Sequence, residues 1–122
     1  MSTDVIDNLK GFFFKIEPPD MSSNVNASCK ASSVDISWTT GFHGGDMQQF
    51  YVLVVDEKTG ITKIYNTYVT SYEKNEDTAY NIALQPGLYS FRILGINSFG
   101  NATTSGESTC QINGLYVYIN RY

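Results

Sequence analysis

Between Leu84 and Gly100 the sequence reads LQPGLYSFRILGINSFG, and its side chains alternate along the chain. Pro86-Gly87 is a turn signal near the start, and Asn97 to Gly100 is another at the end. Between them one parity holds Tyr89, Phe91, Ile93 and Gly95, and the other holds Leu88, Ser90, Arg92, Leu94 and Ile96. This period of two predicts a β-strand. Because both parities carry apolar residues, we expect a central strand with a neighbour on each side.

Other short alternating stretches lie on both sides of this strand. They are residues 25–29, 34–38, 50–55, 80–84 and 110–112, and the β-rich segment 61–72 has the weak pattern typical of an edge strand or a long crossing segment. Residues 50–55 are apolar on both parities, which predicts a second central strand. Strands recur every 8–12 residues or so, and no helical period appears. The sequence therefore predicts an all-β sandwich of about seven strands.

Composition excludes several classes of protein. A chain of 122 residues is long enough for one domain with one core. Hydrophobic residues make up 42% and charged residues 16%, which argues against disorder of the whole chain. The net charge is −4 and no basic stripe is present, so we expect no nucleic-acid partner. No apolar run reaches the roughly 20 residues of a membrane helix, so we expect no membrane insertion by this chain.

Candidate catalytic chemistry is sparse. His43 is the only histidine and lies in a glycine-rich loop beside Asp46, where a metal site or a general base would need partners that the sequence does not supply. No nucleophile-elbow pattern surrounds a serine, and Gly44-Gly45 precedes no helix that could bind phosphate. We therefore expect no enzyme activity, no cofactor and no metal, with His43 as a solvated loop residue.

The chain resembles a fibronectin type III domain over residues 18–113. The residues that carry the resemblance are Pro18-Pro19, the run 34–38 ending in Trp38, Phe50, Val52, Leu84, Pro86, Tyr89, Phe91, Arg92, Asn97 and Gly100. The resemblance implies an immunoglobulin-like β-sandwich of two antiparallel sheets, with a core that includes Trp38, Phe50, Leu84, Tyr89 and Phe91. In such sandwiches the tyrosine after the turn packs its ring inward and bonds a backbone group through its hydroxyl. The link from Leu84 to Tyr89 is one residue shorter than usual, which puts this corner in question.

The same resemblance sets the expected domain boundaries. Residues 1–17 are expected to be an N-terminal extension or linker, and residues 114–122 are expected to be a C-terminal tail. Phe12, Phe14 and Ile16 share one parity in the extension and would pack a seam or contact a partner domain. The loop 41–50 is similar to that of fibronectin type III domains in immunoglobulin-superfamily cell-adhesion receptors.

Cys29 and Cys110 are expected to form a disulfide. Alternation places both on inner faces, and in the topology of the family the first and last strands run side by side, which brings the two within bridging distance. The alternative is two buried thiols that pack as small hydrophobic groups. A disulfide would indicate an oxidising compartment. The sequons Asn26-Ala27-Ser28 and Asn101-Ala102-Thr103 agree with an extracellular or cell-surface location as glycosylation sites.

The start of the sequence is a poor signal peptide, so we interpret the chain as a piece of a longer secreted or membrane-anchored protein. The function we expect is protein binding or cell adhesion through loops at one pole, 39–49 and 97–106, together with the connection before Tyr80. Their candidate anchors are Phe42, His43, Met47 and Phe99, although the two phenylalanines could instead cap the core. A second candidate surface is the outer face of the third strand, with Tyr51, Leu53 and Val55.

Two alternatives remain for function. The chain could be a structural spacer in a multidomain protein, with neighbouring domains of the same chain as its partners. It could also be the ligand-binding domain of a cytokine-type receptor, or an accessory domain of a secreted enzyme. The absence of a Trp-Ser-x-Trp-Ser box weakens the cytokine-receptor version.

Overall fold

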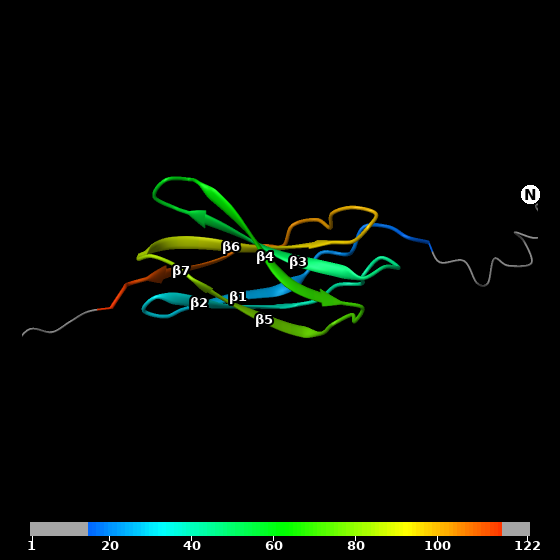
Figure 1. The fold of residues 1–122 in the computed structure, drawn as a ribbon, viewed down its shortest axis with the longest axis horizontal. Coiled ribbons are helices and arrows are strands. Elements are labelled where there is room, and N and C mark those ends of the chain that lie inside the picture. Colours follow the sequence, from blue (N-terminus) through cyan, green and yellow to red (C-terminus); the bar gives the residue numbers. More distant parts are fainter. Residues whose placement is uncertain (1–14, 116–122) are drawn as a thin grey trace, which may run out of the picture.

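A computed structural model describes residues 15–115, which fold into a sandwich of two antiparallel sheets (Figure 1). Its strands are β1 (Ser23–Cys29), β2 (Ser33–Thr39), β3 (Gln48–Asp56), β4 (Thr62–Ser71), β5 (Asp77–Ala83), β6 (Gly87–Ile96) and β7 (Ser108–Ile112). One sheet has the order β1-β2-β5 and the other β4-β3-β6-β7. The described residues contain seven strands and no helix, so the expected all-β sandwich is confirmed.

The strands β3 and β6 form the middle of the larger sheet, as their two apolar parities predicted. Their inward residues pair directly, Val52 with Ile93 and Val54 with Phe91. Strand β4 pairs only with β3 and is an edge, which confirms the interpretation of residues 61–72. On β2 the polar side chains of one parity lie on the outer face of the sheet, and the side chains of the other parity are buried in the core.

The core lies between the two sheets. Trp38, Phe50 and Phe91 are almost fully buried, and the rings of Trp38 and Phe50 have their centroids 5.5 Å apart. Tyr89 is buried beside Phe91, and Leu84 is partly buried against the same cluster. Large side chains from both sheets thus share one core, which is the main source of stabilising apolar burial in such a fold.

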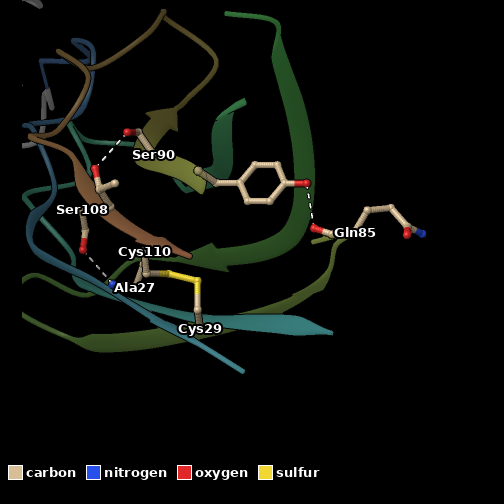
Figure 2. Close-up of a disulfide and its surroundings, with 8 residues drawn as sticks. Ala27, Cys29, Gln85, Ser90, Ser108 and Cys110 are labelled. Carbon is tan, nitrogen blue, oxygen red and sulfur yellow. Dashed lines mark hydrogen bonds between the residues drawn. A yellow bond between two sulfur atoms is a disulfide. The ribbon is translucent and has the colours of Figure 1, made fainter. Parts of the chain in front are cut away.

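The tyrosine corner forms despite the short link before it. The Tyr89 hydroxyl donates a hydrogen bond to the backbone carbonyl of Gln85 at 2.8 Å (Figure 2). Burial raises the pKa of the Tyr89 hydroxyl, and the nearby carboxylate of Asp56 acts in the same direction. The neutral hydroxyl therefore persists as a donor and ties the turn before β6 to the strand itself.

A disulfide joins Cys29 on β1 to Cys110 on β7, with their Cα atoms 5.8 Å apart (Figure 2). The two strands are edges of different sheets, so the bond closes one side of the sandwich. Beside it, the backbone N–H of Ala27 donates to the Ser108 hydroxyl at 3.0 Å. Strands β1 and β7 belong to different sheets, so the disulfide and this hydrogen bond join them in place of a backbone hydrogen-bond ladder.

Several strands begin earlier than the sequence predicted, and β1 and β7 each begin two residues early, at Ser23 and Ser108. Strand β3 begins at Gln48 rather than at residue 50, and β5 begins at Asp77 rather than at residue 80. Gln48 is fully buried, and its Nε2 donates to the carbonyl of Gly41 at 2.9 Å. Gln48 has the parity of the inward-facing residues of β3 but is polar, so it interrupts the apolar pattern. Hydrophobic periodicity alone therefore placed the start of β3 too late.

Candidate binding surface at one pole

Three connections meet at the pole where residues 15–22 lie (Figure 1): the loop 40–47, the loop 72–76 and the loop 97–107. Thr40 joins the first two. Its N–H donates to the carbonyl of Glu76 at 2.9 Å, its hydroxyl donates to the carbonyl of Glu73 at 2.8 Å, and its carbonyl accepts from the N–H of Asn75 at 2.8 Å. The expected clustering of the connection before Tyr80 with the other loops is therefore confirmed, through a threonine that the sequence analysis did not single out.

Asn97 joins the remaining segments. Its Nδ2 donates to the carbonyls of His43 at 3.0 Å and Glu17 at 2.5 Å. Its Oδ1 accepts from the N–H groups of Phe99 at 2.9 Å and Gly100 at 3.1 Å. All these bonds come from one buried side chain, so Asn97 fixes the start of its own loop against the loop 40–47 and the N-terminal segment.

Three aromatic rings of this pole lie together, those of Phe42, His43 and Tyr72, and a fourth, that of Phe99, lies in the loop 97–107. The ring of His43 lies 4.6 Å from that of Phe42 and 5.8 Å, edge-on, from that of Tyr72. Phe99 is 64% exposed and Met47 41%. Phe42 is 36% exposed, so neither phenylalanine is a buried cap of the core. We define the pole surface as Phe42, His43, Met47, Tyr72 and Phe99.

Tyr72 belongs to this surface, although the sequence analysis missed it. It is 60% exposed and follows the last residue of β4 directly. The only available signal was the expectation that the connection before Tyr80 joins the other loops. Its side chain could be placed beside His43 only once the register of β4 against β3 was known.

Asp46 is one of the carboxylates of this pole, and its bonds tie the loop 40–47 to the loop 97–107. The Ser98 hydroxyl donates to its carboxylate, and the N–H of Met47 donates at 2.8 Å. These bonds favour the ionised form and hold the pKa of Asp46 below its ordinary value. The Nδ1 of His43 accepts from the N–H of Gly45 at 3.0 Å, which fixes the ring within the loop.

The second candidate surface is less accessible than a free apolar patch. Tyr51, Leu53 and Val55 on the outer face of β3 are half-buried. They pair across the sheet with Asn66, Ile64 and Thr62 of β4 and with Leu94, Arg92 and Ser90 of β6. Their neighbours thus cover much of them, whereas Ile64, opposite Leu53 on β4, is 65% exposed.

Both asparagines of the sequons are exposed. Asn26 lies on β1, at an edge of the smaller sheet, and Asn101 lies in the loop 97–107, where it bridges to Ile96. Residues 15–115 contain no group of three or more His, Cys, Asp or Glu side chains arranged to hold a metal ion. They also contain no helix long and apolar enough to cross a membrane. Phe12 and Phe14 of the extension lie outside the described residues, and Ile16 is 44% exposed.

Comparison with solved structures decides the fold. The described sandwich matches domains A168–A170 of titin (TM-score 0.59, 21% identity, 80% of this chain and 33% of that one). It also matches the FN1–FN3 domains of chicken CNTN1 (TM-score 0.64, 17% identity, 80% of this chain and 34% of that one). A third match is the twitchin kinase region of C. elegans (TM-score 0.62, 16% identity, 86% and 18%).

The chain has the fibronectin type III fold. It spans about a third of the titin and CNTN1 structures that it matches. No family model and no curated protein matches the sequence. The identities lie below those at which function can be carried over, so the fibronectin type III assignment describes architecture, and the site must be argued from its own residues.

Proposed function

We propose that this fibronectin type III domain is a non-catalytic protein-binding or cell-adhesion module that binds its partner through the pole surface. The observation that carries the proposal is the exposure of aromatic and methionine side chains on a rigid loop base. Exposed aromatic residues are frequent anchors of protein interfaces. Thr40 and Asn97 hold the loops beneath them in place, which lowers the entropy lost on binding.

We also propose an extracellular or cell-surface location. The disulfide between Cys29 and Cys110 suits an oxidising compartment, and exposed Asn26 and Asn101 suit glycosylation. Titin, twitchin and CNTN1 share the fold, so the fold itself does not select the compartment. Within this proposal, residues 18–113 form the domain, residues 1–17 an N-terminal extension or linker, and residues 114–122 a C-terminal tail.

The proposal is tested with a double variant at the pole surface. Phe42→Ala/Phe99→Ala removes two exposed rings, and Ile64→Ala/Leu88→Ala removes two exposed apolar side chains far from that pole as a matched control. Binding of each protein to a panel of purified extracellular domains is measured by surface plasmon resonance. We expect the first variant to lose at least tenfold in affinity for any domain that the wild type binds. Equal affinities for wild type and both variants would contradict it.

The spacer role is the alternative that this experiment separates. A spacer would bind no member of the panel through its loops, and substitution of the loops would leave every partner unaffected. A ligand-binding domain of a cytokine-type receptor would instead bind a soluble cytokine, so purified cytokines are measured beside the panel of extracellular domains. The glycans are tested separately, by intact mass before and after enzymatic removal of N-linked sugar from the secreted protein.

A further inference from the structure

The only Asn-Gly pair of the sequence, Asn113-Gly114, directly follows the last residue of β7. Asn113 is exposed, whereas Ile112 before it is almost fully buried in the core. The pair therefore lies in water at a point where the chain is still anchored to the sandwich. Neither the pole surface nor the disulfide involves it.

The side-chain amide of an asparagine is an electrophile that the main chain itself can attack. Here the backbone nitrogen of Gly114 can attack Cγ of Asn113 and close a cyclic imide, a succinimide. In this step the attacking nitrogen loses its proton to solvent, and Nδ2 of Asn113 takes up a proton and leaves as ammonia. Glycine hinders the attack least of all residues, because it has no Cβ beside the attacking nitrogen.

The fold leaves the attacking nitrogen outside the hydrogen-bond ladder. Strand β7 ends at Ile112, and no backbone carbonyl of residues 15–115 accepts a hydrogen bond from the N–H of Gly114. Asn97 shows the opposite arrangement, since its buried amide both donates to and accepts from backbone groups of the pole. An amide held in that way is not available for ring closure, whereas that of Asn113 lies in solvent.

The structure also requires the glycine that makes the pair reactive. Gly114 has a φ of +83°, a region that glycine adopts without strain. A Cβ there would lie 3.0 Å from Cγ of Pro86, so a larger residue would be crowded as well as strained. We propose that Asn113 is a modification site, at which the folded protein deamidates spontaneously to aspartate and isoaspartate.

The products follow from the two ways in which water opens the ring. Cleavage of the bond between the Gly114 nitrogen and Cγ of Asn113 gives aspartate and restores the normal main chain. Cleavage of the bond to the main-chain carbonyl carbon gives isoaspartate, whose main chain runs through Cβ and Cγ. Both products carry one more negative charge than the amide. Isoaspartate also lengthens the main chain immediately before the close approach of Gly114 to Pro86.

Peptide mapping of the full folded chain tests the site directly. The protein is incubated in mildly alkaline buffer, reduced and cleaved with trypsin, and the gain in mass of each asparagine is followed by tandem mass spectrometry. Asn75 is the internal control, because it is exposed, is followed by Glu76 and lies in a different tryptic peptide. We expect Asn113 to deamidate at least about tenfold faster than Asn75, since residue 114 has no Cβ. Equal rates would overturn the proposal.

A second measurement asks whether the folded state itself permits the reaction. The same incubation is run in urea, where every asparagine is released from the fold. We expect the folded and unfolded rates at Asn113 to lie within about tenfold of each other, because Asn113 is exposed and lies beyond the β7 ladder. Deamidation at Asn113 only in urea would show that the fold protects the pair, and would overturn the proposal.

The variant Asn113→Gln supplies a matched control for the charge. Glutamine keeps the amide but would have to form a larger ring, so the more acidic species that accumulates in the wild type should be absent on ion exchange. An isoaspartate-specific methyltransferase should label the aged wild type and not the aged variant. Equal labelling of the two proteins would place the modification elsewhere and contradict the assignment to Asn113.

Discussion

The amide of Asn97 donates to the backbone carbonyl of His43 across a 54-residue separation in sequence. The same nitrogen reaches Glu17, which lies 80 residues away. One buried side chain thereby couples the base of two recognition loops to the segment that enters the domain. The loops are connecting segments in sequence, but this bond makes them part of the rigid scaffold beneath the pole surface.

Replacement of Asn97 by alanine is expected to destabilise the domain by about 2 kcal/mol, because the partly buried carbonyls of His43 and Glu17 lose their donor. Urea unfolding followed by tryptophan fluorescence measures the change. Asn101→Ala is the matched control, since Asn101 is exposed in the same loop. The interpretation fails if both variants unfold at the same urea concentration.

Gly44 and Gly60 provide a matched pair for backbone crowding. Both have positive φ, of +79° and +73°, but a Cβ at Gly44 would lie 2.1 Å from the carbonyl oxygen of Glu17 and one at Gly60 would meet nothing within 4 Å. Gly60→Ala should cost about 1 kcal/mol from left-handed strain alone. Gly44→Ala should cost clearly more, since the segment at Glu17 must move. Thermal unfolding compares the two, and a Gly60→Ala loss equal to or larger than that of Gly44→Ala would refute the crowding.

Tyr89→Phe is expected to cost about 1 kcal/mol, because the carbonyl of Gln85 loses the hydroxyl that bonds it. The control is Tyr80→Phe on β5, whose ring is partly buried against the same core. Equilibrium unfolding in urea gives both values. A stability unchanged by Tyr89→Phe would mean that the corner hydrogen bond contributes nothing net.

The double variant Cys29→Ser/Cys110→Ser is expected to lower stability by about 2–5 kcal/mol, since the bond closes a separation of 81 residues in the unfolded chain. Calorimetry of the oxidised protein against the variant measures the loss. Intact mass of the secreted protein under non-reducing conditions, after alkylation, provides the chemical check. Two alkylated cysteines there would remove the main support for the proposed compartment.

The carboxylate of Asp46 predicts an acid-sensitive pole. The Ser98 hydroxyl and then the N–H of Met47 hold its pKa below the ordinary value of about 3.9. A carboxyl whose pKa is depressed by folding stabilises the fold above its unfolded pKa, and this contribution is lost as pH falls through the folded pKa. The loop contacts of Asp46 should therefore weaken only below about pH 4.

Ser98→Ala is the variant that tests this contribution. It should raise the pKa of Asp46 toward its ordinary value, as measured by the carboxyl ¹³C shift against pH. Asp35 is an internal control, because hydrogen bonds from Lys30 and Asn81 lower its pKa independently of Ser98. A titration of Asp46 unchanged by Ser98→Ala would contradict the assigned cause.

Alternation of side chains predicted the strands and most of the core, because burial on one face of a sheet leaves a period of two in any sequence. It failed at Gln48, whose amide is buried on an inward parity and satisfied on one side by Gly41. The Gln48 side chain lies against Gly95 of β6, where a Cβ would lie 2.7 Å from its Oε1, although the register partner of Gly95 is Phe50. Such a pairing of a buried amide with a glycine is a three-dimensional fit that no local pattern indicates.

The pole surface was predicted only in part for a similar reason. Glycines and polar residues between strands indicated the loops, and the family resemblance brought them to one pole. The contact of His43 with Tyr72 and the bonds of Asn97 depend on distances between segments remote in sequence. Residue type alone could nominate Phe42 and Phe99, but not the scaffold that presents them.

The position of the disulfide also limits how the domain responds to mechanical tension. Cys29 and Cys110 lie near the two ends of the described chain, so a pull applied at both ends passes through the covalent bridge. The segment between the two cysteines, which are 81 residues apart, would span roughly 280 Å if fully extended. It cannot lengthen while the disulfide is intact. Single-molecule stretching should show that extension only after reduction, so the segment between the two cysteines resists lengthening under load until a reducing environment breaks the bond.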